Sequence, residues 1–153
     1  EPEACAGAIR TQIQALPEAL RGLSLQMSPG RFLTAPCGTL VTRVRAVKPG
    51  APPLVVLDAD PAQCPRLSKS GAYHPVSVLH AAGRRMQMQL LTGSSQESLP
   101  MRRLLPELRP GDPVLIGMLG ADGRSLASHY GGAELCPEYL VRADGKIEPV
   151  TAC

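Results

Sequence analysis

The chain has 153 residues, of which 44% are hydrophobic and 19% charged, and its net charge is +3. This length suits one domain that buries roughly two-thirds of the surface of its unfolded chain, and the composition excludes a disordered protein. The small net charge, without basic residues interleaved with aromatic ones, argues against nucleic-acid binding. No apolar run approaches the roughly 18 residues that span a bilayer, and no signal peptide is visible, so we expect a cytoplasmic protein without a membrane segment.

The first part of the chain predicts a helix followed by a short strand. Apolar residues recur at helical spacing over residues 5–22, where Pro17 suits the first position of a fresh turn and Gly22 suits the helix stop. Residues 23–27 alternate between apolar and polar side chains, which predicts a short strand before a turn at residues 28–31.

The central part predicts two strands of a sheet. Residues 39–48 alternate, with Arg43 and Arg45 on the face opposite the apolar side chains, which indicates a half-buried strand. Residues 54–59 are mostly apolar on both faces, so we expect this strand to be covered on both sides. Residues 66–74 are expected to hang from the sheet as a loop that carries polar side chains.

Further strands follow in the second half. Residues 84–92 alternate cleanly, and their methionines are interpreted as core residues and not as a cofactor site. Residues 93–98 are expected to form a polar loop, residues 101–109 a short helix or turn, and residues 113–119 a buried strand.

The chain is expected to end in a hairpin. Asp144-Gly145 lies between two short runs of strand-forming residues, which is a strong hairpin signal. A leading helix followed by seven or eight strands predicts a mainly β fold, a Greek-key β-barrel or sandwich and not a parallel α/β sheet.

Other chemistry receives little support from the sequence. The five cysteines are far apart and form no C-x-x-C pair, so free thiols are expected. The three histidines lack the spacing of metal ligands. A serine–histidine–aspartate arrangement would need Ser125 or Ser128, His129 and Asp122 from one loop, where triad geometry is rare.

Three groups of residues, in the same order, carry a resemblance to a known family. They are residues 29–31 followed by 38–44, then residues 58–74, and last residues 110–130. Their order and separations resemble the C-terminal half of the fold-type III, PLP-dependent amino-acid decarboxylases, which include diaminopimelate, ornithine and arginine decarboxylases.

This resemblance implies a domain division. In the family, a (β/α)8 barrel carries the lysine that binds PLP, and a β-barrel follows it. Residues 1–27 resemble the last helix and strand of the (β/α)8 barrel, and residues 28–153 resemble the β-barrel domain. The chain has three lysines, Lys48, Lys69 and Lys146, and none has the sequence context of the PLP-binding lysine.

The resemblance also implies which binding residues are retained. Arg31 and Arg66 match arginines that bind phosphate or carboxylate groups in the family. Glu97 matches the glutamate of the interface motif Cys-Glu-Ser-x-Asp. We therefore expect Arg31, Arg66 and Glu97 to be the candidate substrate- or cofactor-binding residues.

Other functional positions of the family are changed in this chain. Ser28 replaces the glutamate that keeps the pyridine ring of PLP protonated, and Ser70 and Asp122 replace two tyrosines. At the interface motif, Gln96 replaces the cysteine and Pro100 replaces the aspartate. An aspartate at position 122 would repel the phosphate that the family's tyrosine holds.

The sequence thus predicts a β domain that is not catalytic alone. It would need PLP only together with a PLP-binding (β/α)8 barrel partner, or it would act within a homo-oligomer, completing or regulating a site at a subunit interface. Two alternatives stay open. The chain is part of an active decarboxylase whose barrel lies elsewhere, or it is a protein–protein interaction module without a ligand.

Overall fold

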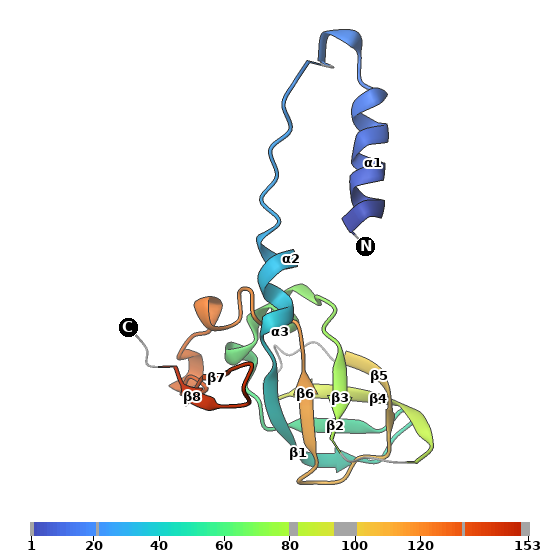
Figure 1. The fold of residues 1–153 in the computed structure, drawn as a ribbon. Coiled ribbons are helices and arrows are strands. Elements are labelled where there is room, and N and C mark those ends of the chain that lie inside the picture. The colour runs from blue at the N-terminus through green and yellow to red at the C-terminus, as the bar shows by residue number, and fades with distance from the viewer. Residues whose placement is uncertain (1, 21, 80–82, 94–100, 133, 151–153) are drawn as a thin grey trace.

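The computed structural model describes residues 2–20, 22–79, 83–93, 101–132 and 134–150. These residues form a nearly closed β-barrel, a separate two-stranded hairpin, and an N-terminal helix that stands away from the barrel (Figure 1). The prediction of a mainly β fold led by a helix is confirmed.

The described residues form three α-helices, five short 3-10 turns and eight strands. The helices are α1 (Pro2–Gln14), α2 (Gly30–Thr34) and α3 (Pro65–Ser70). Short 3-10 turns lie at Glu18–Leu20, Ala35–Cys37, Pro61–Gln63, Arg124–Leu126 and Tyr130–Gly132. The strands are β1 (Leu40–Lys48), β2 (Leu54–Leu57), β3 (Val76–Val78), β4 (Arg85–Thr92), β5 (Met101–Pro106), β6 (Pro113–Ile116), β7 (Tyr139–Val141) and β8 (Ile147–Pro149).

Six of these strands form one sheet in the order β3-β6-β1-β2-β4-β5. All neighbouring strands are antiparallel except β2 and β4, which run parallel. The outer strands β3 and β5 approach each other, so the sheet nearly closes into a barrel (Figure 1). Closure removes most of the exposed edge that an open sheet would present.

The core lies inside this barrel and follows the predicted alternation. On β1, Val44 is 2% exposed while Arg43 and Arg45 face outward. On β4, Met88 and Leu90 are buried, as expected for core methionine and leucine. The buried apolar core residues are Val44, Val55, Leu57, Cys64, Leu67, Met88, Leu90, Met101, Leu105, Leu108, Val114 and Ile116.

The N-terminal prediction is confirmed for the helix and wrong for the strand. Helix α1 ends at Gln14, because Pro17 has no N–H to donate and restricts the residue before it. Residues 23–27 are extended but pair with no strand in the described part of the chain, and Leu23 is 67% exposed. An extended segment becomes a strand only when a neighbour accepts its backbone hydrogen bonds.

Two further expectations are corrected. Residues 66–74, expected to form a loop, contain most of α3. Residues 101–109, expected to form a helix or turn, begin with β5, which pairs with β4. The side chains of Met101, Leu105 and Leu108 are buried in the barrel core.

The C-terminal hairpin prediction is confirmed. Strands β7 and β8 pair around a turn in which Gly145 has a φ of 84°, a conformation that glycine adopts without strain. The predicted loop over residues 93–98 falls almost entirely outside the described residues. In the described part of the chain, no helix is both long and apolar enough to cross a bilayer.

Candidate functional site

An ion pair joins two of the positions that the resemblance singles out. The Nη1 atom of Arg66 lies 3.2 Å from Oδ2 of Asp122, although the two residues are 56 positions apart. Their side chains are 26% and 39% exposed, so the pair is at the surface of the domain but partly shielded from water. The carboxylate of Asp122 thus neutralises the charge of the retained arginine.

Local structure fixes Arg66 at this place. Asp60 caps the preceding 3-10 turn, because its Oδ1 accepts a hydrogen bond from the backbone N–H of Ala62 at 2.8 Å. Pro65 then begins α3, a favoured position for proline. The next residue along, Leu67, is buried in the core and anchors the helix, which places Arg66 near the barrel surface.

The loop that carries Asp122 is held by close backbone contacts. The backbone N–H of Gly120 donates to the carbonyl of Ala35 at 3.0 Å, and that of Leu119 donates to Gly38 at 2.9 Å. A Cβ atom on Gly120 would overlap the carbonyl oxygen of Thr34. Helix α2 and the turn after it therefore sit directly against the loop that presents Asp122.

Arg31 lies on α2, at the same end of the barrel as this loop (Figure 1). Its side chain is exposed and makes no ion pair with any residue that the structure describes. Arg31 is therefore accessible to an anion from outside the domain, whereas Arg66 already has one.

The remaining predicted positions are placed only in part. Glu97, Gln96 and Pro100 lie outside the described residues. Ser28 is exposed in the extended segment before α2. The structure brings together Arg66 and Asp122, and sequence reasoning missed that these two side chains contact each other.

The arrangement does not fit a bound phosphate. Asp122 places a carboxylate where the resemblance puts a phosphate-binding tyrosine, and like charges repel strongly in a partly shielded site. The phosphate group of PLP therefore has no suitable place beside Arg66 in this chain as it stands.

The described histidines and cysteines give no evidence of a metal site. His74 is 3% exposed, and its Nδ1 lies 3.0 Å from the carbonyl oxygen of Gly117, as expected for a packing residue. Among the residues described, no group of three or more histidine, cysteine or acidic side chains could hold a metal ion. Cys64 is buried, and burial raises the pKa of its thiol to about 12, which makes it unreactive.

Comparison with known proteins finds similar sequences that are diaminopimelate decarboxylases. No family model matches the chain. It is 34% identical over 134 residues to the diaminopimelate decarboxylase of Escherichia coli K12, a match that covers 77% of this chain and 32% of the relative. It is 34% identical over 144 residues to the diaminopimelate decarboxylase of Helicobacter pylori, covering 90% of this chain and 35% of the relative.

Solved structures agree with these relatives. The crystal structure of Helicobacter pylori diaminopimelate decarboxylase complexed with L-lysine matches with a TM-score of 0.71 and 30% identity, covering 86% of this chain and 33% of that one. The chain therefore spans about a third of the length of the curated relatives it matches.

Proposed function

Because the chain belongs to the fold-type III, PLP-dependent amino-acid decarboxylases and corresponds to their C-terminal part, we propose that it is a β domain that is not catalytic alone. In this proposal it completes or regulates the site of a (β/α)8 barrel partner at a subunit interface, and PLP is held by that partner. A cytoplasmic location remains a prediction.

The observation that carries the proposal is the Arg66–Asp122 ion pair. A catalytic domain of this family would keep its anion-binding arginine available to ligand. Here Arg66 is paired with a carboxylate of the chain itself, at 3.2 Å. The barrel fold is retained while the residue pattern at its ligand-binding end has changed, which favours a structural or regulatory role over chemistry.

The N-terminal segment supports the need for a barrel partner. None of the residues of α1 is buried, and Leu23, Leu25 and Met27 are each more than half exposed. We propose that residues 1–27 belong with the (β/α)8 barrel and that residues 28–153 form the β domain. In this division the exposed apolar side chains of the segment are covered once the (β/α)8 barrel of the partner is present.

The test has two parts. The purified chain is mixed with PLP and diaminopimelate, and the absorbance of amine-bound PLP and the release of carbon dioxide are measured. We expect neither signal, and both together would contradict the proposal. The chain is then produced together with the barrel part of the Escherichia coli relative, and complex formation is measured by size-exclusion chromatography.

A second candidate function is an active decarboxylase with its barrel elsewhere. The observation that favours it is Arg31, which is exposed and has no ion-pair partner in the described residues. If the co-produced complex releases carbon dioxide and Arg31→Gln abolishes this release, the chain is part of an active decarboxylase. If the chain associates with no barrel and binds no PLP, an interaction module without ligand is the function that remains.

A further inference from the structure

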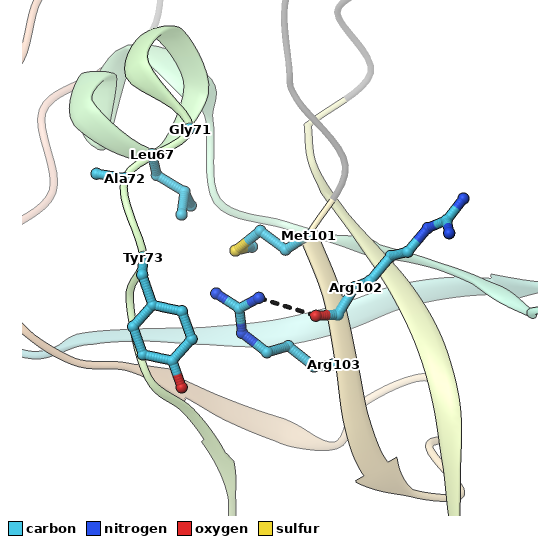
Figure 2. Close-up of a pocket in the computed structure, with 7 residues that line it drawn as sticks. All are labelled: Leu67, Gly71, Ala72, Tyr73, Met101, Arg102 and Arg103. Atoms are coloured by element: carbon cyan, nitrogen blue, oxygen red, sulfur yellow. Dashed lines mark hydrogen bonds between the residues drawn. The ribbon is translucent and has the colours of Figure 1, made fainter.

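The barrel closes at a seam between β5 and the segment before β3, and Arg103 lies across this seam. Its Nη2 donates to the carbonyl of His74 at 2.8 Å, and its guanidinium carbon lies 4.6 Å from the centre of the Tyr73 ring. Its Nη1 donates to the carbonyl of Arg102 at 2.8 Å, as the dashed line in Figure 2 shows. Both of these hydrogen bonds go to neutral oxygens.

The two hydrogen bonds of Arg103 thus bring no negative charge to its guanidinium. No carboxylate in the described part of the chain lies within ion-pair distance of it. Its Nε is buried and has no hydrogen-bond partner. A guanidinium has five N–H donors, and two of the five are used here. A partly buried arginine in this condition is suited to receive an anion.

A pocket of about 320 Å³ opens beside this guanidinium. Figure 2 shows the guanidinium of Arg103 between the ring of Tyr73 and the side chain of Met101, with Leu67 on the far side of the opening. The residues that line the pocket are Leu67, Gly71, Ala72, Tyr73, Met101, Arg102 and Arg103. Cationic and apolar groups share this lining, and none of the lining residues that the structure describes is acidic.

We propose that this pocket binds a small monocarboxylate with an apolar tail, its carboxylate on Arg103 and its tail against Leu67 and Met101. A carboxylate offers two oxygens in one plane, which match the guanidinium fork. A phosphate would leave charged oxygens against the apolar wall without partners, at a cost in desolvation. Arg66 and Asp122 do not line the pocket, so this inference does not rest on the proposed function.

The experiment is a titration of the full chain with sodium butyrate at constant ionic strength. Nuclear magnetic resonance follows the Nε–H signal of Arg103 and the methyl signals of Met101 and Leu67. We expect all three to shift along one saturable curve with a dissociation constant on the order of 1 mM, in keeping with so small a ligand. Butylammonium and inorganic phosphate should each bind about tenfold more weakly or not at all, if charge sign and shape both matter.

Two variants and one control separate binding from folding. Arg103→Gln removes the charge, but it also removes the bond across the seam. Ala72→Glu keeps that bond and adds a negative charge at a residue that lines the pocket, so butyrate affinity should fall about tenfold without unfolding. Arg45→Gln removes an exposed arginine on β1 and should leave affinity unchanged.

The proposal is overturned by shifts that rise linearly without saturation, by phosphate binding as tightly as butyrate, or by equal affinity in Ala72→Glu and the unaltered chain. Loss of affinity in Arg45→Gln as large as that in Ala72→Glu would also overturn it, because the effect would then reflect net charge alone.

Discussion

The Arg66–Asp122 pair is partly exposed to water, so we expect it to contribute little to the free energy of unfolding. Its main effect is to compensate the charge of Arg66. Asp122 has a φ of 59°, a left-handed conformation that asparagine also tolerates, which makes Asp122→Asn a well-matched change. We expect the free energy of unfolding to change by less than about 1 kcal/mol, since exposed ion pairs contribute little. With the negative charge of Asp122 removed, inorganic phosphate should bind near Arg66 measurably more tightly, and isothermal titration calorimetry checks this.

The matched control is Glu148→Gln, which removes the exposed Arg142–Glu148 pair at 2.8 Å in the C-terminal hairpin. This variant should bind phosphate no better than the unaltered chain. Equal phosphate affinity in Asp122→Asn and the unaltered chain would show that Asp122 does not shield Arg66.

The thiol of Cys64 should make stability depend on pH above 9. Burial, followed by smaller effects of Cys136 and Asp60, raises its pKa from 9.0 to about 12. Between these values the unfolded chain loses the thiol proton and the folded chain keeps it, so unfolding becomes easier as the pH rises. The loss is at most about 1.4 kcal/mol per pH unit across this window and is absent below pH 9.

Urea unfolding at several values between pH 8 and pH 11 measures this dependence. Other groups titrate in the same range, so the comparison is with Cys64→Ala, whose stability should fall less steeply with pH. Cys5→Ala, which changes an exposed thiol, should keep the full slope. Identical slopes in the unaltered chain and Cys64→Ala would refute the role given to Cys64.

At the scale of elements, sequence patterns correctly predicted the strands that bury one face. They did not predict a strand whose formation depends on pairing with another strand. The alternation of β1 and β4 is local, and so both strands were found. Strand β5 was mistaken for a helix because its identity depends on pairing with β4. Pro106 ends β5, which is an outermost strand of the sheet, where proline removes no ladder bond that the sheet needs.

The candidate site was predictable in part for the same reason. The family resemblance pointed to Arg66 and Asp122 separately, because each lies in a recognisable block of residues. Their contact depends on how α3 and the loop after β6 are placed, and no local pattern records this. The cluster of Arg103 with Tyr73 gave no sequence signal at all, since the two residues meet only when the sheet closes.

The contact between α2 and the loop that carries Asp122 depends on a residue without a side chain. Gly120→Ala would bring a Cβ atom against the carbonyl oxygen of Thr34, which is backbone and cannot move aside easily. We expect a loss of about 1–3 kcal/mol in the free energy of unfolding, typical of overpacking. Chemical denaturation measures it.

Gly30→Ala provides the control, since Gly30 begins α2 and a Cβ atom there would meet nothing within 4 Å. Its stability should change by no more than about 0.5 kcal/mol, as for other exposed sites. If the two substitutions lower the free energy of unfolding equally, the lack of a side chain at Gly120 is not what allows α2 to approach this loop closely.

At the scale of the whole molecule, the barrel and the N-terminal segment differ in how they are stabilised. The barrel has its own core, whereas residues 2–20 and 22–27 contribute no buried side chain. Figure 1 shows α1 joined to the barrel through an extended segment. A segment of this kind adds apolar surface to the domain without adding to its packing, which is the state expected of one part of a larger assembly.

Deletion of residues 1–27 tests this division directly. Because residues 2–20 and 22–27 contribute no buried side chain, the free energy of unfolding should change by less than about 1 kcal/mol and unfolding should stay cooperative. Binding of a dye that reports exposed apolar surface should fall at the same time, since Leu23, Leu25 and Met27 are removed.

A matched deletion of the hairpin, residues 138–150, should leave dye binding by the N-terminal segment in place. A shortened chain that no longer unfolds cooperatively would mean that residues 1–27 are part of the β domain, and the boundary at residue 28 would have to be abandoned.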